Sequence, residues 1–367
     1  MASNNTTYRI MISGGGTGGH IFPAVAVAEE LKRQYPTAEI LFVGALGKME
    51  MQKVPEAGFA IEGLPIRGLQ RRLTLKNFLL PFYIAGSLAK AFSLLASFKP
   101  QAVIGFGGYA SAPLLFAASL KNIPVFIQEQ NSYAGLANKV LSNRAKKICV
   151  AYDDMQKYFP AKSIVFTGNP IRLNVLKALQ EKISYKTDWK LNSNQKVLLV
   201  IGGSLGAKTI NKSVASCLQQ LKALGLQVIW QTGVYDYEAM SKHEDDFVKV
   251  VPFIKDMHKA YASSDIIVSR AGAIAVSELS IVGKPVILIP SPNVTEDHQT
   301  KNAMALVKKN AAVMIKDINA EKDLLSTVAN ILNDESKQKI LIENITAMAK
   351  PNAAKDIVEL MLKEINS

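Results

Sequence analysis

The segment Ser13-Gly14-Gly15-Gly16-Thr17-Gly18-Gly19-His20 lies between an apolar run at 8–13 and a helical pattern of apolar residues over 24–34. A strand that leads through glycines into a helix is the opening unit of a doubly wound α/β fold. Such glycines let the backbone approach a phosphate or a sugar closely, and the helix start supplies amide donors and positive dipole. This stretch therefore predicts a site for an anion or a sugar at the end of the first strand.

Two further turns of this kind follow expected strands. They are Gly105-Phe106-Gly107-Gly108-Tyr109 and Gly202-Gly203-Ser204-Leu205-Gly206. Strands and helical segments alternate on both sides of residues 168–170, which predicts two Rossmann-like domains with parallel sheets covered on both faces. We expect the domains to comprise residues 1–170 and 171–352. A C-terminal amphipathic helix at about 353–367 is expected to pack back on the first domain.

Two familiar interpretations of glycine turns fit poorly. A dinucleotide-binding domain needs an acidic residue at the end of its second strand to hold a ribose, and the strand here ends Phe42-Val43-Gly44-Ala45. A P-loop needs a glycine directly before its lysine, where this chain has Ala207 before Lys208. Glycines that serve only tight turns explain one such loop better than they explain three. The pattern therefore disfavours nicotinamide enzymes and P-loop NTPases.

The composition indicates an ordinary globular protein. The chain has 367 residues, of which 49% are hydrophobic and 20% charged, and its length suggests about two domains. Cys149 and Cys217 are too few for a zinc cluster or a disulfide framework, which favours a reducing compartment. The four histidines lack metal-ligand spacing, and the first residues do not read as a secretory signal. We expect no metal and no cofactor.

The charge distribution points to an anionic partner. The formal net charge is +13, and no Asp or Glu occurs between residues 63 and 128. A basic surface attracts nucleic acid, anionic lipid or phosphorylated substrates. The most apolar run, residues 77–98, is interrupted by Pro81 and Lys90 and falls short of the ~20 residues of a spanning helix. It suits an amphipathic element on a membrane surface, or a core helix. Nucleic acid is disfavoured because the basic residues are interleaved with aliphatic rather than stacking aromatic residues.

Two side chains are candidates for catalysis or substrate binding because of their positions in the sequence. His20 lies where a glycine turn becomes a helix, which disfavours the imidazolium and leaves a ring able to accept a proton. A purely local hydrogen-bonding role for His20 is the alternative. Glu278 lies early in an apolar helical segment and could accept two ribose hydroxyls, or could be a solvated surface residue. Residues 297–302 carry amides and hydroxyls suited to sugar hydroxyls.

Together these motifs resemble one family, the bacterial N-acetylglucosaminyltransferases that convert lipid I to lipid II in peptidoglycan synthesis. The resemblance implies a GT-B fold, two Rossmann-like domains facing each other across a cleft. It also implies inverting transfer of GlcNAc from UDP-GlcNAc to the 4-hydroxyl of MurNAc in lipid I, without a metal. The motifs that carry the resemblance are residues 15–20, 105–109, 129–131, 168–172, 202–206, 270–273 with 278, and 297–299.

The resemblance also implies roles for single residues. His20 would be the general base, with Glu129 the second candidate. The second domain would bind UDP-GlcNAc and the first domain the lipid-linked acceptor. The residues implied in substrate binding are Thr17, Gly18, Gly19, Asn131, Arg172, Ser204, Phe253, Ile254, Ala273, Glu278 and Gln299. Those implied at the acceptor diphosphate are Gly15, Gly16, Gly107, Gly108 and Tyr109.

A peripheral location on the cytoplasmic side of the bacterial membrane follows from the same resemblance. The anionic inner leaflet would be a partner, and the resemblance leaves room for cell-wall and division proteins. Another GT-B enzyme or a UDP-sugar epimerase is the alternative enzyme, and a basic RNA- or lipid-binding protein is the non-enzymatic alternative. The residues expected to contact the membrane are Arg71, Arg72, Phe78, Leu79 and Phe82.

Overall fold

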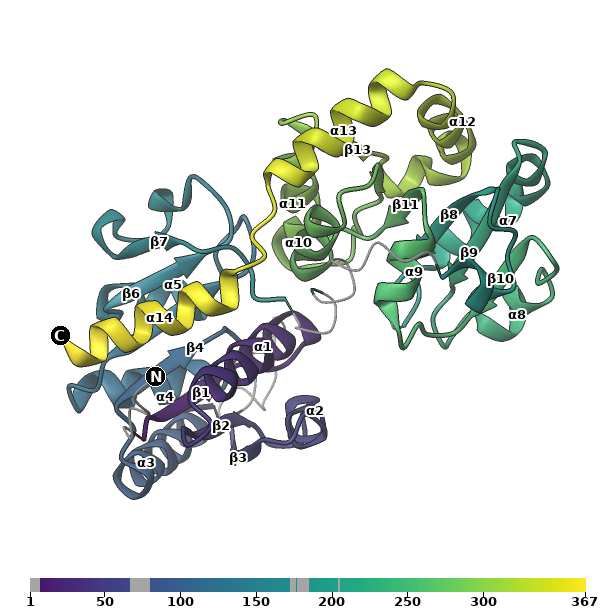
Figure 1. Cartoon of the computed structure of the whole chain (residues 1–367). Coiled ribbons are helices and arrows are strands. Elements are labelled where there is room, and N and C mark those ends of the chain that lie inside the picture. Colours follow the sequence, from purple (N-terminus) through teal and green to yellow (C-terminus); the bar gives the residue numbers. More distant parts are fainter. Residues whose placement is uncertain (1–6, 67–79, 172–175, 177–184, 204) are drawn as a thin grey trace. The chain divides into compact units, whose positions relative to one another are not determined.

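The computed structural model describes residues 7–66, 80–171, 176, 185–203 and 205–367. The chain divides into two compact units, each built on its own sheet (Figure 1). Unit 1 comprises Met1–Arg172 with Pro351–Ser367, and unit 2 comprises Leu173–Lys350.

Unit 1 contains a parallel sheet of seven strands among its described residues, in the order β3-β2-β1-β4-β5-β6-β7. Its interior strands are buried over most of their length, as expected for a parallel sheet covered on both faces. The strands are β1 (Arg9–Ser13), β2 (Glu39–Ala45), β3 (Ala60–Leu64), β4 (Ala102–Gly105), β5 (Val125–Glu129), β6 (Lys147–Val150) and β7 (Ile164–Phe166).

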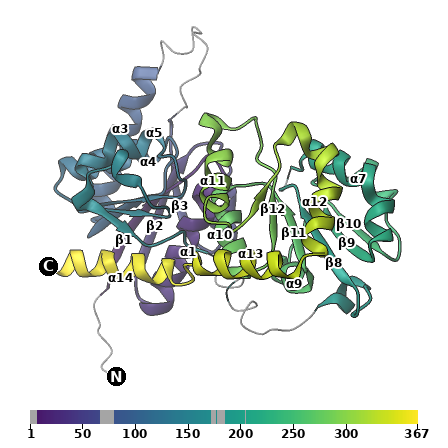
Figure 2. The ribbon, with the colours of Figure 1, turned by 90° about the horizontal axis from the view of Figure 1, so that it is seen from above.

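Helices cover both faces of this sheet. On one face α1 and α14 lie side by side, and both contribute buried apolar residues to one core cluster (Figure 1). On the other face α4 packs beside both α3 and α5 over a second cluster (Figure 2). The helices are α1 (Gly18–Gln34), α2 (Glu50–Glu56), α3 (Leu80–Phe98), α4 (Ser111–Leu120), α5 (Leu136–Leu141) and α14 (Ala353–Asn366). Short 3₁₀ turns are η2 (Ser142–Arg144), η3 (Met155–Lys157) and η4 (Ala161–Ser163).

Unit 2 repeats the scheme with a parallel sheet in the order β10-β9-β8-β11-β12-β13. Apolar residues of α7 and α12 and the partly buried side chains of α8 form its main core against the sheet. The strands are β8 (Lys196–Ile201), β9 (Leu226–Gln231), β10 (Val248–Val251), β11 (Ile266–Ser269), β12 (Val286–Leu288) and β13 (Val313–Met314). The helices are α7 (Lys208–Ala223), α8 (Tyr237–Ser241), α9 (Met257–Ser263), α10 (Ala273–Val282), α11 (His298–Val307), α12 (Ala320–Leu332) and α13 (Glu335–Ala347), with 3₁₀ turns η5 (Lys186–Trp189), η6 (Thr295–Asp297) and η7 (Asp317–Asn319).

Each sheet reverses its strand order beside its first strand. In unit 1 the reversal lies between β1 and β4, where Ser13 pairs with Gly105, and in unit 2 between β8 and β11, where Ile201 pairs with Ser269. Ligands of open α/β sheets bind at the carboxyl ends of the strands at such a point, because neighbouring connections diverge there to opposite faces. All three glycine turns follow strands that border a reversal.

The first helix begins earlier than its apolar pattern. That pattern covers residues 24–34, whereas α1 begins at Gly18, so His20 lies where the turn becomes a helix, as expected. The first turn of α1 consists of glycines and His20, which carry no apolar periodicity. The last glycines of the turn are therefore helical, and their amides lie at a helix N-terminus.

Both cysteine thiols are buried in these cores. Burial raises the pKa of Cys149 to about 12 and that of Cys217 to about 11. At pH 8 a thiol with a pKa near 11 is ionised in only about one molecule in a thousand. We therefore expect the native protein to resist iodoacetamide and to react at two sites once unfolded, as counted by mass spectrometry. Rapid labelling of the native protein would contradict this packing.

Candidate active site

The glycine loops after β1 and β4 pack directly on each other in unit 1. The Phe106 N–H donates to the Ser13 carbonyl at 2.7 Å, and the Gly15 N–H to the Gly107 carbonyl at 3.3 Å. A Cβ on Gly108, whose φ is +88°, would lie 2.5 Å from the Gly15 carbonyl oxygen. The two loops can approach this closely only because no side chain stands between them. They form one continuous backbone surface at the strand ends.

His20 is held by this surface. Its Nδ1 lies 2.8 Å from the Gly15 carbonyl oxygen. A carbonyl can only accept a hydrogen bond, so Nδ1 carries the hydrogen and Nε2 holds the lone pair of the neutral ring. Nε2 faces Gly107, where an added Cβ would lie 3.1 Å away. His20 is partly exposed, and in this tautomer Nε2 is the ring atom that can accept a proton.

Glu50 is a residue that the sequence analysis missed. It begins α2, is 1% exposed, and accepts hydrogen bonds from the Gly16 N–H at 2.9 Å and the Ala45 N–H at 3.0 Å. Glu50 lies five residues beyond Ala45, the residue at which the second strand ends. The Glu50 carboxylate nevertheless lies at the end of the second strand and binds backbone amides of unit 1. Its bond to the Gly16 N–H holds the first glycine loop in place.

Glu129, the second base candidate, is also enclosed. It is 1% exposed, and its oxygens accept the N–H of Asn131 at 3.1 Å, the N–H of Gly135 at 2.9 Å and Nδ2 of Asn138 at 2.8 Å. The same carboxylate contacts Nδ2 of Asn131 at 3.4 Å. These bonds hold the turn between β5 and α5. Glu129 therefore holds Asn131 in position through both its backbone and its side chain.

The remaining predicted residues of unit 1 belong to the two glycine loops and to the start of α1. Thr17 precedes α1 in an extended conformation, and Gly18 and Gly19 form its first turn. The amide of Gly16 is occupied by Glu50, so an anion at this helix start would meet the amides that follow it. The Tyr109 side chain is 54% exposed at the end of the second glycine loop.

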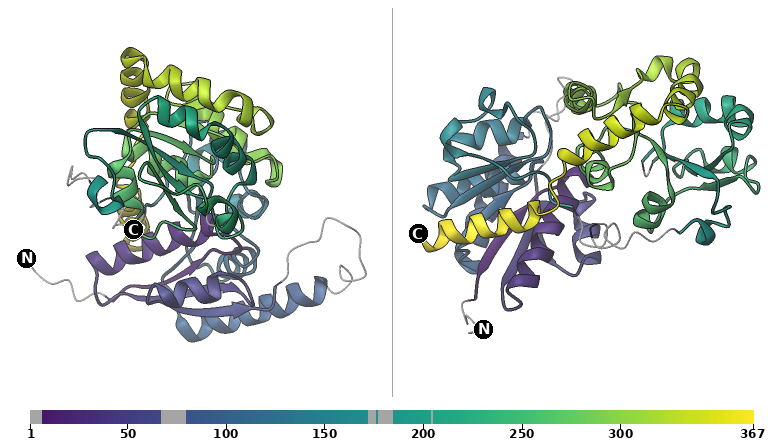
Figure 3. Two further views of the ribbon diagram at one scale, coloured as in Figure 1. Left: turned by 90° about the vertical axis from the view of Figure 1, so that its right-hand side faces the viewer. Right: turned by 45° about the horizontal axis from the view of Figure 1, so that its top comes forward.

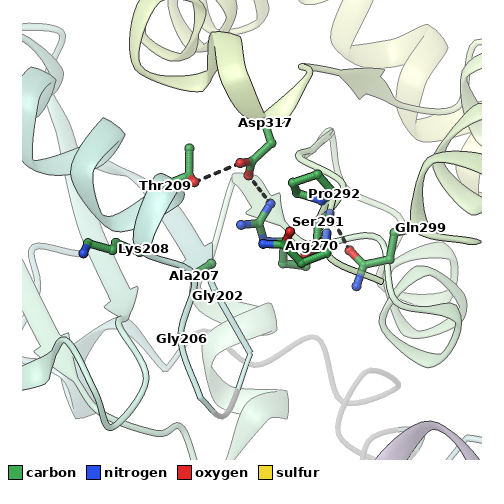
Figure 4. A pocket seen from close by; sticks show the side chains of 11 residues that line it. Gly202, Gly206, Ala207, Lys208, Thr209, Arg270, Ser291, Pro292, Gln299 and Asp317 are labelled. Atoms are coloured by element: carbon green, nitrogen blue, oxygen red, sulfur yellow. Dashed lines mark hydrogen bonds and ion pairs between the residues drawn. The ribbon is translucent and has the colours of Figure 1, made fainter. Parts of the chain in front are cut away.

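Unit 2 contains a pocket of about 320 Å³ at its own strand-order reversal (Figure 4). Loops that follow β8, β11, β12 and β13 all contribute to it. Gln299 lines it, and its Oε1 accepts the Ser291 N–H at 2.9 Å. The lining residues are Gly202, Gly206, Ala207, Lys208, Thr209, Arg270, Ser291, Pro292, Asn293, Gln299 and Asp317.

Arg270 and Asp317 tie the walls of this pocket together. Asp317 pairs with the Arg270 guanidinium and accepts the Thr209 hydroxyl at 2.9 Å (Figure 4). Arg270 also donates to the carbonyls of Ile289 at 3.0 Å and Pro290 at 3.2 Å. Sequence analysis missed Asp317, because it follows a strand of only two residues that gives no pattern. Because Arg270 neutralises its charge, Asp317 can line a pocket whose other polar groups are mostly hydrogen-bond donors.

Other predicted residues of unit 2 lie outside the lining of this pocket. Glu278 is buried, not solvated, and accepts the Tyr261 hydroxyl at 3.1 Å. Ala273 begins α10 and is buried. The Phe253 side chain is 51% exposed, whereas Ile254 is buried with its N–H donating to Oε1 of Gln231 at 2.9 Å.

Some predicted residues are beyond the described part of the chain. They are Arg71, Arg72, Phe78, Leu79, Arg172 and Ser204.

Helix α3 carries the candidate membrane surface. Its segment Pro81–Phe98 is long and apolar enough to cross a membrane by length and composition, and 17% of it is buried. The expectation that this apolar run falls short of a membrane-spanning length was therefore wrong by length and composition. Pro81 stands in the first turn of α3, where proline is tolerated. However, Ala91 and Leu95 pack in the core, and Lys90 pairs with Glu62 of β3 at 2.9 Å. The first turns of α3 extend beyond α4 and α5 (Figures 2 and 3). Phe82, which lies in these turns, is 76% exposed.

Within the described ranges, no three His, Cys, Asp or Glu side chains gather in a group that could hold a metal ion.

Comparison with known proteins matches both units. Residues 10–150 match the glycosyltransferase family 28 N-terminal domain, and residues 197–361 match the family's C-terminal domain. A relative from Cytophaga hutchinsonii is 52% identical over 360 residues, covering 98% of each chain. One from Flavobacterium psychrophilum is 49% identical over 366 residues, also 98% of each. Both are named UDP-N-acetylglucosamine–N-acetylmuramyl-(pentapeptide) pyrophosphoryl-undecaprenol N-acetylglucosamine transferase.

Solved structures agree with this family and with its GT-B fold. The crystal structure of Acinetobacter baumannii MurG matches with a TM-score of 0.79 and 31% identity, over 97% of this chain and 99% of that one. The UDP-GlcNAc 2-epimerase of Neisseria meningitidis, bound to UDP-GlcNAc, matches with a TM-score of 0.68 over 97% and 100% of the chains. Its identity is 18%, so this second likeness shows a shared fold alone.

The contact between the glycine loops predicts a difference between two glycine substitutions. Gly58 and Gly108 both have positive φ, but an added Cβ meets nothing within 4 Å at Gly58 and meets the Gly15 carbonyl at Gly108. We expect G58A to lower the free energy of unfolding by about 1 kcal/mol, the cost of the left-handed backbone. G108A should cost roughly 1–3 kcal/mol more, because the loops must separate. Equal losses in urea unfolding would refute the close contact.

Proposed function

This chain belongs to glycosyltransferase family 28, and we propose that it transfers GlcNAc from UDP-GlcNAc to the 4-hydroxyl of MurNAc in lipid I. The product is lipid II, a precursor of bacterial peptidoglycan. One observation carries the proposal: relatives at about 50% identity over nearly the whole of both chains bear this transferase name. The placement of His20 and of the unit 2 pocket supports it, since each lies at the ligand-binding edge of its sheet.

The donor is assigned to unit 2. The start of α7 and the glycine turn before it present amides to an anion, which suits the UDP diphosphate. Gln299 on the opposite wall suits a GlcNAc hydroxyl.

The nucleoside is assigned to residues outside the lining of this pocket. The exposed ring of Phe253 can cover uracil. Since the Ile254 N–H is occupied by Gln231, the Ile254 carbonyl is the atom assigned to the uracil N–H. Glu278 would accept ribose hydroxyls beside Tyr261. By resemblance, Arg172 and Ser204 belong to the same site.

The acceptor is assigned to unit 1. The paired glycine loops would hold the lipid-linked diphosphate against their backbone, and Thr17, Gly18 and Gly19 supply the nearest helix-start groups. By resemblance, Asn131, whose N–H donates to Glu129, would contact the GlcNAc of the donor together with Thr17. Tyr109 borders the same loops with an exposed ring.

We propose the following chemical step from the assigned roles. The MurNAc 4-hydroxyl attacks the anomeric carbon from the face opposite UDP, the bond to UDP breaks, and His20 Nε2 accepts the hydroxyl proton. The departing diphosphate carries negative charge that the amides at the start of α7 stabilise. We assign no step to a metal.

Membrane contact is assigned to the exposed start of α3. A helix anchored in the core by Ala91 and Leu95 cannot leave the domain to span a bilayer, but its exposed apolar end can enter the interface. The positive net charge would draw the protein to the anionic inner leaflet. Arg71, Arg72, Phe78 and Leu79 extend this surface by sequence.

The experiment that tests the function is UDP release from UDP-GlcNAc with and without a lipid I analogue. Acceptor-dependent release that persists in EDTA is the expected result. Release without acceptor, accompanied by free or epimerised sugar, would favour an epimerase. No release at all, with binding that weakens steeply as salt rises, would favour a binding protein.

Replacement of the base should reduce turnover without loss of donor binding. We expect H20A to lower kcat at least about a hundredfold, the usual contribution of general base catalysis. Affinity for UDP-GlcNAc, measured by calorimetry, should be unchanged because the donor is assigned to unit 2. The matched control is H243A, which changes a histidine of unit 2 beside Trp230. Near-normal turnover by H20A would refute the base assignment.

If the exposed start of α3 contacts the membrane, replacing its exposed aromatic ring should weaken binding to vesicles. F82S removes a ring that is 76% exposed, and Y235S removes one that is 78% exposed in unit 2. Burying an aromatic ring contributes about 1.5–3 kcal/mol, so F82S should weaken binding to phosphatidylglycerol vesicles roughly tenfold or more in a sedimentation assay. Y235S should bind as the unaltered protein does. Equal binding by all three proteins would exclude this end of α3 from the contact.

A further inference from the structure

The peptide group between Gly15 and Gly16 is hydrogen-bonded at both of its polar atoms. Its carbonyl oxygen faces Nδ1 of His20 at 2.8 Å. Its N–H donates to Oε2 of Glu50 at 2.9 Å. A single peptide group therefore stands between an imidazole on α1 and a carboxylate on α2.

The Glu50 carboxylate fits closely against the backbone around it. Its other oxygen accepts the Ala45 N–H at 3.0 Å. A Cβ on Gly15 would lie 2.1 Å from Oε1, and one on Gly44 would lie 2.5 Å from Cγ of Glu50. Two glycines thus make the space that Glu50 occupies, and the side chain is 1% exposed. Burying a charge is costly unless it is hydrogen-bonded, and here both oxygens are.

We propose that Glu50 is a positioning residue that acts on His20 through the Gly15–Gly16 peptide group. The inference rests on the proposed function, in which His20 is the general base. A carboxylate that accepts the peptide N–H polarises the peptide and makes its carbonyl a stronger acceptor, because bonds in a chain reinforce one another. The stronger carbonyl holds the hydrogen on Nδ1 and keeps Nε2 as the proton acceptor.

The arrangement also balances charge during the reaction. When the acceptor O–H bond breaks, a new N–H bond forms at Nε2 and the ring becomes an imidazolium. The buried negative charge of Glu50 lies two hydrogen bonds away and stabilises this cation, while Glu50 itself exchanges no proton. In hydrolytic triads a carboxylate orients histidine by direct contact. Here a backbone peptide stands between the two groups.

A role that is only structural would alter stability but not the imidazole. The test therefore measures the ring itself, by ¹⁵N NMR of histidine-labelled full-length protein at about pH 8, where an ordinary histidine is neutral. The variants are E50Q, which removes the charge with little change in shape, and the control E56Q. Glu56 lies on the same helix, is exposed, and pairs with Lys53.

The unaltered protein should show His20 as the Nδ1–H tautomer. In E50Q the tautomer population of His20 should shift toward Nε2–H. Glutamine has one acceptor oxygen, whereas the N–H groups of Gly16 and Ala45 each bind a separate oxygen of Glu50. We expect kcat to fall about tenfold or more, the usual effect of losing a group that orients a functional histidine. KM for UDP-GlcNAc should change little, and E56Q should match the unaltered enzyme in every respect.

Several results would overturn the proposal. One is an Nε2–H tautomer in the unaltered protein, a measurement that needs no variant and holds even if E50Q fails to fold. Another is an E50Q protein with the kcat and histidine spectrum of the unaltered enzyme. A loss of kcat in E50Q with an unchanged tautomer would reduce Glu50 to a loop support. Absence of acceptor-dependent UDP release by the unaltered enzyme would refute the proposed function instead, and the tautomer measurement separates that failure from this one.

Discussion

Close contact between the backbones of two loops is the constraint on which unit 1 depends. The loops after β1 and β4 leave neighbouring strands and turn to opposite faces of the sheet, yet they touch at Gly15 and Gly108. Any side chain at the contact would separate them. Because they touch, the Gly15 carbonyl is fixed where it can orient His20, and Gly107 leaves Nε2 uncovered by a side chain. The position of the proposed base therefore follows from backbone packing.

Carboxylates at the base of loops recur in both units. Glu50 holds the first glycine loop, Glu129 holds the turn that carries Asn131, and Asp317 holds Arg270 and Thr209. Each is buried or partly buried, and each is surrounded by N–H, O–H or guanidinium donors. Desolvating a carboxylate is offset only when such donors are in place. These residues therefore favour one loop arrangement before any substrate arrives, which is the preorganisation that a transferase needs.

Sequence alone predicted the α/β class and the glycine turns at strand ends, because those features depend on short-range patterns, and it identified His20 as the candidate base that the proposal uses. It did not predict Glu50 or Asp317. Glu50 acts through its contact with the Gly16 N–H, a long-range contact with no local signal, and Asp317 follows a strand too short to recognise. The pattern identified Glu278 but not its burial beside Tyr261. It also treated Lys90 as an interruption, whereas a salt bridge to Glu62 accommodates that charge within a continuous helix.

The central claim is that the chain transfers GlcNAc to a lipid-linked MurNAc with inversion at the anomeric carbon. The most direct test is the configuration of the product formed from UDP-GlcNAc, an α-linked donor, and a lipid I analogue. Proton NMR of the isolated product should show a new β-linked GlcNAc on the MurNAc 4-oxygen. An α-linkage, attachment at another hydroxyl, or a free sugar as the sole product would contradict the claim.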